Sequence, residues 1–384
     1  MPSWEPLEDR YSNKRPRKIL SLDGGGIRGV ITLEILAKME NELREKLKKE
    51  KEFRLCDYFD YIGGTSTGAI IAAGLSLGMS VKELMKFYTD DGKDMFTMAS
   101  PWKLWKSLYR SESLERMLQK TFGHDTNLDI SNGKIKCLLT VVTMNRNTDS
   151  PWPITNNPFA KYNDKSRADC NLNIKLHQLI RASTAAPIYF PSEILNWDPL
   201  NSKKKITFVD GGVTPYNNPS FLLYKIATQP AYNLNWETGE NNLLIVSVGT
   251  GSHISIGKYR NLFHTIYSLP TNLMYAMEVD QDINCRAIGR CTYGAKIDRE
   301  LENMVPMDNK GNVLSGKQKN KADFLYVRYN ADLSQDGLNL LNLNHIKANK
   351  VQKMNSVKSI KELREVGKAI AEDQVDLSHF ESFI

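Results

Sequence analysis

The chain has 384 residues, of which 41% are hydrophobic and 25% are charged, a composition typical of folded globular proteins and unlike that of disordered or fibrous chains. Its formal net charge of +7 comes from 51 basic and 44 acidic residues, and the basic residues are scattered, so nucleic-acid binding is not indicated. The five cysteines are odd in number and lack C-x-x-C spacing, which argues against a disulfide framework and against a zinc site.

Short β-rich runs alternate with longer helical patterns along the first 250 residues, as in a sheet that is covered by helices. Beyond about residue 252 this alternation weakens. We expect one domain over residues 1–384, with a core at about 18–250 and a helical or mixed C-terminal extension at about 251–384. In chain order, the predicted elements are a strand at 19–22, a helix at 30–49, a strand at 58–64, a helix from 69, a strand at 134–142, a helix at about 173–185 that Pro187 ends, strands at 205–209 and 242–249, a helix around 261–288, a strand at 324–330 and a final helix near 357–372.

The first motif, DGGGIRG at residues 23–29, lies between a predicted strand and a predicted helix. Glycines at such a turn leave backbone N–H groups open to a negative group. The motif fits the G-x-G-x-x-G pattern of dinucleotide-binding proteins, but the carboxylate expected about 20 residues later falls in a charged helical pattern. We therefore favour a loop that holds an oxyanion formed during a reaction, with nicotinamide or flavin binding and a purely structural turn as alternatives. The residues concerned are Gly24, Gly25, Gly26, Arg28 and Gly29, with Arg28 adding positive charge or orienting the loop.

The second motif, GTSTG at residues 64–68, also lies between a predicted strand and a predicted helix. In that context G-x-S-x-G describes a nucleophile elbow, in which a sharp, strained turn exposes a serine hydroxyl. Ser66 would be the nucleophile, and Gly64 and Gly68 would leave room for the neighbouring backbone. An ordinary glycine-bounded turn is the alternative.

A serine nucleophile needs a base. The late histidines, His253, His264, His345 and His379, do not lie in loops that resemble a catalytic site. Asp210 is a better candidate, because it ends a predicted strand directly before Gly211 and Gly212, at the sheet edge where α/β proteins place their chemistry. Asn218 and Pro219 predict a helix start that braces this loop, although Asp-Gly after a strand is also a common turn. A further small-residue segment, RASTAAPIYFP at 181–191, by itself indicates close packing.

Taken in order, DGGGIRG, GTSTG, ASTAAPIYFP and DGG followed by NNP resemble the patatin-like phospholipase family over about residues 18–220. The resemblance implies a three-layer α/β/α fold with a mostly parallel central sheet. It also implies a catalytic dyad of Ser66 and Asp210 without histidine, an oxyanion loop at 24–29, and neither a metal nor another cofactor. The expected activity is hydrolysis of ester bonds in membrane glycerophospholipids through an acyl-enzyme. A dinucleotide-binding oxidoreductase and a non-catalytic lipid-binding module remain as alternatives.

The expected partner is a phospholipid membrane surface. Trp102 and Trp105 alternate with basic residues in the segment 92–110, a combination that suits a lipid–water interface, although a buried helix would give the same pattern. The polar N-terminus lacks the apolar stretch of a signal peptide, and the longest apolar run, 68–79, is too short to span a bilayer. We expect a cytoplasmic protein that contacts the membrane peripherally. The family resemblance further suggests a bacterial anti-phage effector that a cyclic nucleotide activates.

Overall fold

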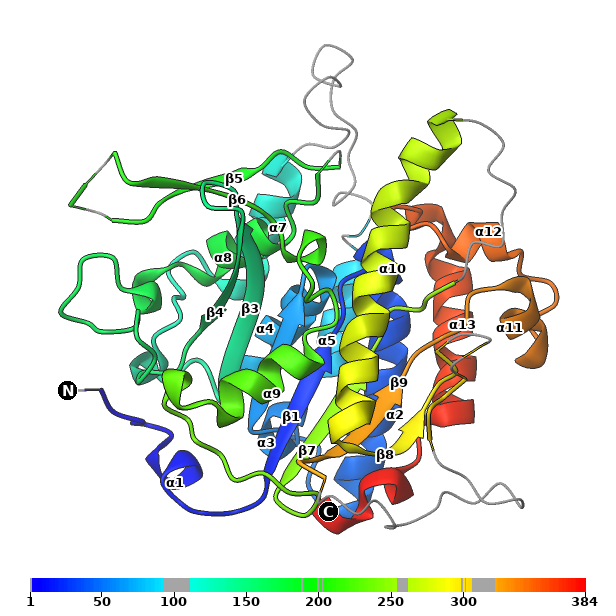
Figure 1. Ribbon diagram of the computed structural model, residues 1–384, viewed down its shortest axis with the longest axis horizontal. Helices are drawn as coiled ribbons and strands as arrows, with labels where there is room; N and C mark the ends of the chain where they lie inside the picture. Colours follow the sequence, from blue (N-terminus) through cyan, green and yellow to red (C-terminus); the bar gives the residue numbers. More distant parts are fainter. Residues whose placement is uncertain are drawn as a thin grey trace.

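The computed structural model describes residues 2–90, 92, 111–187, 189–198, 200–201, 203–253, 262–297, 300, 302–305 and 322–384, and for 262–271 only the backbone. Nine strands of the described chain form one sheet (Figure 1). Its order is β5-β6-β3-β2-β1-β7-β9-β8, with β4 also paired to β3. The strands are β1 (Arg17–Leu22), β2 (Tyr61–Thr65), β3 (Leu138–Asn145), β4 (Ser150–Thr155), β5 (Glu193–Asn196), β6 (Lys205–Asp210), β7 (Leu243–Val248), β8 (Arg290–Gly294) and β9 (Leu325–Tyr329).

The centre of the sheet is parallel, and its strands are buried on both faces. All six residues of β7 are buried, as is typical of a parallel strand that is covered on both faces. Only the pairs β3–β4, β3–β6 and β5–β6 are antiparallel among the described strands. The predicted mostly parallel sheet is therefore confirmed.

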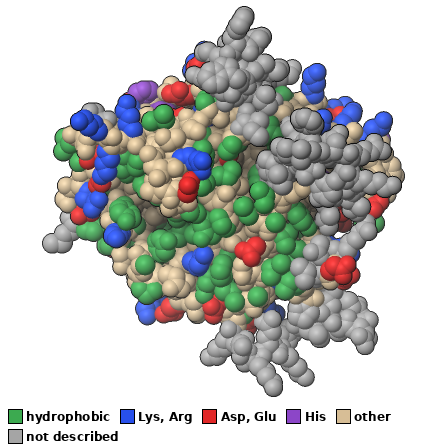
Figure 2. Space-filling view, turned by 45° about the horizontal axis from the view of Figure 1, so that its top comes forward, with side chains coloured by type: hydrophobic (Ala, Val, Ile, Leu, Met, Phe, Trp, Pro, Cys, Tyr) green, Lys and Arg blue, Asp and Glu red, His purple; other side chains and the backbone are tan. Residues whose placement is uncertain are grey.

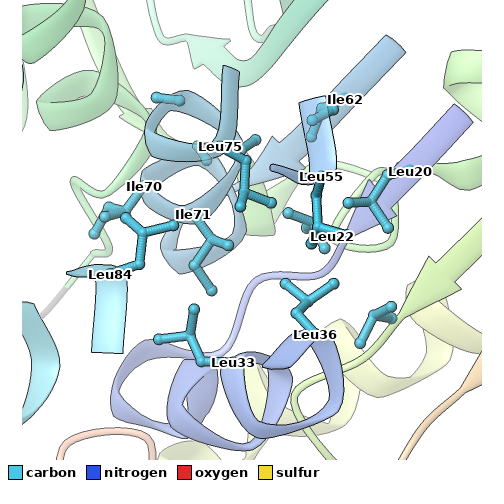
Figure 3. Close-up of a cluster of buried hydrophobic side chains, with 14 of the residues drawn as sticks. Leu20, Leu22, Leu33, Leu36, Leu55, Ile62, Ile70, Ile71, Leu75 and Leu84 are labelled. Atoms are coloured by element: carbon cyan, nitrogen blue, oxygen red, sulfur yellow. The ribbon is translucent and has the colours of Figure 1, made fainter. Parts of the chain in front are cut away.

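Helices cover both faces of the sheet, so the predicted three-layer α/β/α architecture is confirmed (Figure 1). One core cluster joins the sheet to the helices α2 (Gly29–Lys46), α4 (Thr67–Ser76), α5 (Val81–Thr89), α7 (Ser111–Phe122), α8 (Leu176–Ser183) and α13 (Ile360–Gln374). The other joins it to α9 (Ser220–Thr228) and α10 (Leu262–Ile288). Figure 3 shows part of the first cluster, where Leu20 and Leu22 of β1 face Leu33 and Leu36 of α2. Full burial of such a side chain contributes about 1.5–3 kcal/mol.

Several predicted boundaries need correction. The strand predicted at 58–64 begins only at Tyr61, because α3 (Leu55–Tyr58) precedes it. The strand predicted from 134 begins at Leu138, and the helix predicted from about 173 to 185 runs from Leu176 to Ser183. The strands β4, β5 and β8 are not among the predicted elements. β4 was hidden by two prolines in SPWPIT, residues that a strand with only one paired edge tolerates.

The chain beyond residue 250 continues the same sheet. β9 pairs with β7 in parallel register, from Leu244–Leu325 to Val248–Tyr329, and β8 pairs with the far edge of β9. α13 packs against α2 through Gly367, which lies close to the backbone of Ile31. That residues 1–384 form a single folding unit stays a prediction.

Candidate active site

Ser66 occupies the sharp turn between β2 and α4. Its backbone has φ 54° and ψ −121°, a conformation that costs a non-glycine residue about 1–3 kcal/mol and that marks functional turns. The flanking glycines make the turn possible, because a Cβ at Gly64 would overlap the carbonyl of Gly68, and one at Gly68 would overlap the carbonyl of Leu22. This is the geometry of a nucleophile elbow.

The strand register places Asp210 beside this turn. One edge of β3 pairs with β4 from Thr140 to Asn145, so β2 and β6 must share the other edge. β2 uses that edge as far as Thr65, which lies opposite Val142, and β6 uses it from Asp210, which lies opposite Thr143. The ends of β2 and β6 therefore face consecutive residues of β3. Ser66 follows directly, and its Oγ donates a hydrogen bond of 2.7 Å to Oδ2 of Asp210.

The Asp210 carboxylate is held rigidly and is shielded from water. Its Oδ1 accepts a 2.7 Å hydrogen bond from the Gly212 N–H, and its side chain is almost entirely buried, with the residue only 4% exposed. Burial raises the pKa of Asp210 to about 6, although the hydrogen bonds from Ser66 and Gly212 and the charge of Arg181 act in the opposite direction. A Cβ at Gly211 would overlap the carbonyl of Val142, so this loop also requires its glycine.

The small-residue segment at the end of α8 braces both members of the pair. Ser183 Oγ accepts a 2.9 Å hydrogen bond from the Ser66 N–H and donates one of 2.6 Å to the Val142 carbonyl. The Ala185 carbonyl accepts a 3.1 Å hydrogen bond from the Asp210 N–H. The packing interpretation of this segment was therefore incomplete. A serine and small residues directly before the proline were the available signal, but their partners could not be read from the sequence.

The glycine loop lies against Ser66. A Cβ at Gly24 would come within 3.3 Å of Ser66 Cβ. The Gly24 N–H donates to the Asn217 carbonyl at 3.0 Å, and the Gly24 carbonyl accepts from Thr250 Oγ1 at 2.9 Å. By contrast, the N–H groups of Gly25 and Gly26 have no acceptor within the described part of the chain. These two groups, with the start of α2 at Gly29 close behind them, are candidate donors for an oxyanion.

Arg28 is buried and borders a small cavity shared with Asn217, His253 and Glu278. No described residue accepts a hydrogen bond from its Nε. Burial lowers the pKa of Arg28, and the charges of Glu278 and Asp23 oppose that shift. The sequence prediction for Arg28, as a source of charge or as a residue that orients the loop, remains a prediction.

Three of the four histidines weighed as bases lie elsewhere, and in the described structure the only hydrogen-bond partner of Ser66 Oγ is Asp210. His253 lines the cavity beside Arg28, and burial lowers its pKa to about 4. His379 contacts Tyr329, and His345 pairs with Glu365 on the surface. The side chain of His264, like Trp102 and Trp105, lies outside the described residues. No cluster of His, Cys, Asp or Glu in the described ranges could hold a metal ion.

The dinucleotide interpretation of the glycine loop finds no support in the strand that follows it. A dinucleotide site requires a carboxylate at the end of the second strand, whereas β2 ends at Thr65 and leads into Ser66. The region about 20 residues after the loop covers the end of α2 and the turn that follows it. The oxidoreductase alternative is therefore not favoured.

A comparison with known families agrees with this geometry. The family model described as patatin-like phospholipase matches residues 20–224, more than half of the chain. The chain therefore belongs to the patatin-like phospholipase family, as its motifs predict. Relatives include two proteins of Solanum tuberosum: Patatin-2-Kuras 1, 29% identical over 259 residues, and Patatin group M-3, 30% identical over 257 residues.

These alignments cover 62% of this chain, and 64% and 62% of the two relatives. The chain thus spans less than two thirds of the length of the curated relatives that it matches. Among solved structures, VipD from Legionella pneumophila aligns with 91% of this chain and 67% of its own, at 12% identity and a TM-score of 0.34. A likeness at that level supports no functional conclusion.

Proposed function

We propose that this protein hydrolyses acyl ester bonds of membrane glycerophospholipids through a Ser66–Asp210 dyad and an acyl-enzyme. The observation that carries the proposal is the 2.7 Å hydrogen bond from Ser66 Oγ to a buried aspartate with a raised pKa. A strained serine that donates to a rigid base is the general arrangement of an activated nucleophile. Family membership supports the same class of reaction.

The reaction begins when Ser66 Oγ attacks the ester carbonyl carbon while Asp210 takes the hydroxyl proton. The carbonyl oxygen becomes an oxyanion, and the Gly25 and Gly26 N–H groups would hold it. Loss of one such donor typically removes about 2.7–4 kcal/mol of transition-state stabilisation. Collapse of this intermediate breaks the ester C–O bond, and Asp210 returns its proton to the departing lysophospholipid oxygen. Water then attacks the carbonyl carbon of the acyl-enzyme while Asp210 again accepts a proton. Collapse of this second intermediate breaks the bond to Ser66 Oγ, Asp210 returns the proton to that oxygen, and the free fatty acid leaves.

The surroundings of the site suit a lipid substrate. Val213, in the loop that follows Asp210, is 38% exposed. On α10, Leu273 is 54% exposed, and the next residue, Met274, lies against Gly212. The hairpin of β5 and β6 exposes Ile194 (60%) and Leu200 (86%). Figure 2 shows hydrophobic side chains gathered across the face turned forward. Contiguous exposed apolar side chains are typical of surfaces that bind a lipid or another protein.

The direct test is fatty acid release from phospholipid vesicles in the presence of a chelator. We expect the wild-type protein to remain active, and Ser66→Ala and Asp210→Ala to lose roughly 10³-fold or more in kcat/KM, because members of such a pair act as a unit. Ser76→Ala, on the same helix as the elbow, is the matched control and should keep its activity. Equal activity of Ser66→Ala and wild type would overturn the proposal. Tight lipid binding without hydrolysis by the wild type would favour the binding-module alternative.

Peripheral membrane association from the cytoplasm is part of the same proposal. Among the described residues, no helix combines the length and the apolarity needed to cross a bilayer. Trp102→Ala and Trp105→Ala test the proposed contact segment, and we expect them to weaken binding to anionic vesicles. Unchanged binding would remove that segment from the proposal.

Activation by a cyclic nucleotide is proposed from the family resemblance alone. The test is vesicle hydrolysis with and without a panel of cyclic dinucleotides. Stimulation by one member of the panel is the expected result, and equal rates with every member would remove the proposal.

A further inference from the structure

Arg328 lies on β9, about 100 residues beyond the region that matches the family, yet it binds the glycine loop directly. Its Nη1 donates to Oδ1 of Asp23 at 2.9 Å and its Nη2 donates to Oδ2 at 2.6 Å. Asp23 immediately precedes Gly24, the first glycine of the loop. Both side chains are buried. A bidentate pair of this kind fixes orientation as well as charge.

Other groups hold the Arg328 guanidinium in place. Its Nη1 also donates to Ser247 Oγ at 2.7 Å, and its Nη2 also donates to Glu278 Oε1 at 2.7 Å. The same Glu278 oxygen accepts from Asn330 Nδ2 at 3.0 Å. Burial alone would lower the pKa of Arg328, but the charges of Asp23 and Glu278 outweigh it and raise that pKa well above its ordinary value. The guanidinium is therefore permanently charged and cannot rotate without losing several partners.

The Asp23 carboxylate is one of several restraints on the same stretch of backbone. The Asp23 N–H donates to the Val248 carbonyl at 3.1 Å, and both sides of Gly24 are held by Asn217 and Thr250. The next two residues, Gly25 and Gly26, carry the N–H groups for which no described residue is an acceptor. Donors of an oxyanion hole are effective because they are fixed before charge develops. Restraints that hold such donors in place therefore affect the rate of the chemical step.

We propose that Arg328 is a positioning residue, which orients the Gly25 and Gly26 N–H groups toward the developing oxyanion by holding Asp23. The proposal rests on the proposed acyl hydrolysis at Ser66. It assigns a role in the reaction to the part of the chain beyond the family match. Arg328 itself does not contact substrate.

A purely structural ion pair is the alternative, and the chain contains a matched control for it. Arg286 is also a buried arginine with a bidentate carboxylate, because its Nε and Nη2 donate to Asp282 at 2.8 and 2.7 Å. Both residues belong to α10 and neither bonds to the glycine loop, although Asp282 Oδ2 also lies 4.0 Å from Arg328 Nε. Arg286→Gln leaves both hydrogen bonds between Arg328 and Asp23 in place, so it should cost stability with little effect on the oxyanion.

The experiment compares Arg328→Gln, Arg328→Lys and Asp23→Asn with Arg286→Gln in the full-length protein. A soluble short-chain ester reports kcat and KM, a fluorophosphonate reports the labelling rate of Ser66, and thermal unfolding reports folding. Arg328→Lys keeps the positive charge at this position, and Asp23→Asn keeps the shape of the side chain. These two milder changes provide the test if Arg328→Gln does not fold.

We expect the folded Arg328 and Asp23 variants to lose roughly 10²-fold in kcat, comparable to loss of an oxyanion donor, with KM within about two-fold of wild type. The labelling rate of Ser66 should fall in parallel, while the Asp210 limb of the pH profile stays in place. Arg286→Gln should lower the unfolding temperature but keep kcat within about three-fold. Unchanged kcat in the Arg328 variants, or an equal loss in Arg286→Gln, would overturn the inference. A wild-type protein that neither hydrolyses the ester nor labels at Ser66 would instead refute the proposed function.

Discussion

At the residue scale, the site depends on how the surroundings of Asp210 tune a weak base. An ordinary aspartate would be ionised far below neutral pH and would hold a proton poorly. Burial raises the pKa of Asp210 to about 6, so the group is mostly ionised at pH 7 and is a better base than an exposed aspartate. The sequence predicted this residue from its place after a strand and before two glycines, but burial and the resulting pKa depend on packing across the sheet.

The pH dependence of the reaction follows from this pKa. Asp210 must be deprotonated to accept the Ser66 proton, so kcat/KM should rise with pH and level off above a midpoint near 6. A series of kcat/KM values for a soluble ester between pH 4 and 8 measures this limb. A midpoint near 4 would show that the aspartate behaves as an exposed carboxylate and would contradict the buried base.

The same burial should reduce the stability of the folded protein at neutral pH. The pKa of Asp210 is higher in the folded state, at about 6, than the ordinary value of 3.8, so folding is favoured while the group is protonated, and this contribution is lost as the pH rises from about 4 to about 6. A difference of about two pKa units corresponds to roughly 3 kcal/mol. Denaturant unfolding of wild type and Asp210→Asn at pH 4 and pH 8 should therefore show the wild type losing stability relative to the variant at the higher pH. The opposite trend would contradict a raised pKa of Asp210 in the folded protein.

At the element scale, the two residues of the proposed dyad meet because β2 and β6 end against consecutive residues of β3. The sequence predicted β2, β6 and the elbow, since each carries a local pattern. It could not predict that β6 runs antiparallel beside the end of β2, because strand order and register are set by long-range pairing. The role of Ser183 was missed for the same reason, since its partners come from β3 and from the elbow.

Ser183→Ala tests this bracing. The change leaves the Ser66 N–H and the Val142 carbonyl without their hydrogen-bond partner, which should cost about 1–3 kcal/mol of stability. Because the lost contact holds the strained turn, we expect kcat to fall roughly ten-fold or more, with a smaller change in KM. Ser131→Ala, at an exposed position in a short turn, is the control. Equal kcat in wild type and Ser183→Ala would show that the elbow does not need this brace.

At the scale of the whole molecule, the sheet runs without interruption across residue 250. β9 pairs with β7, and the β7 residues Leu244 and Val246 are buried against the helices on one face. The sequence suggested an extension beyond 251 because the strand–helix alternation weakens there, and composition alone does not show that β9 lies beside β7. A chain cut after residue 250 would expose the edge of β7 and the faces covered by α10 and α13.

We therefore expect residues 1–250 alone to be insoluble or unfolded, because an exposed parallel edge and an uncovered core favour aggregation. The full chain should unfold in a single transition. Circular dichroism and thermal unfolding of both proteins measure this. A soluble, folded and active 1–250 fragment would show that the C-terminal part is a separate unit and would also weaken the role assigned to Arg328.

The proposed mechanism requires a covalent acyl group on Ser66, formed while Asp210 accepts the proton of the serine hydroxyl. The most direct measurement is mass spectrometry of the protein quenched during turnover of a long-chain ester, followed by peptide mapping. We predict an acyl adduct on the peptide that contains Ser66, present in wild type and absent from Ser66→Ala. Turnover with no adduct, or with the adduct on another residue, would contradict the account.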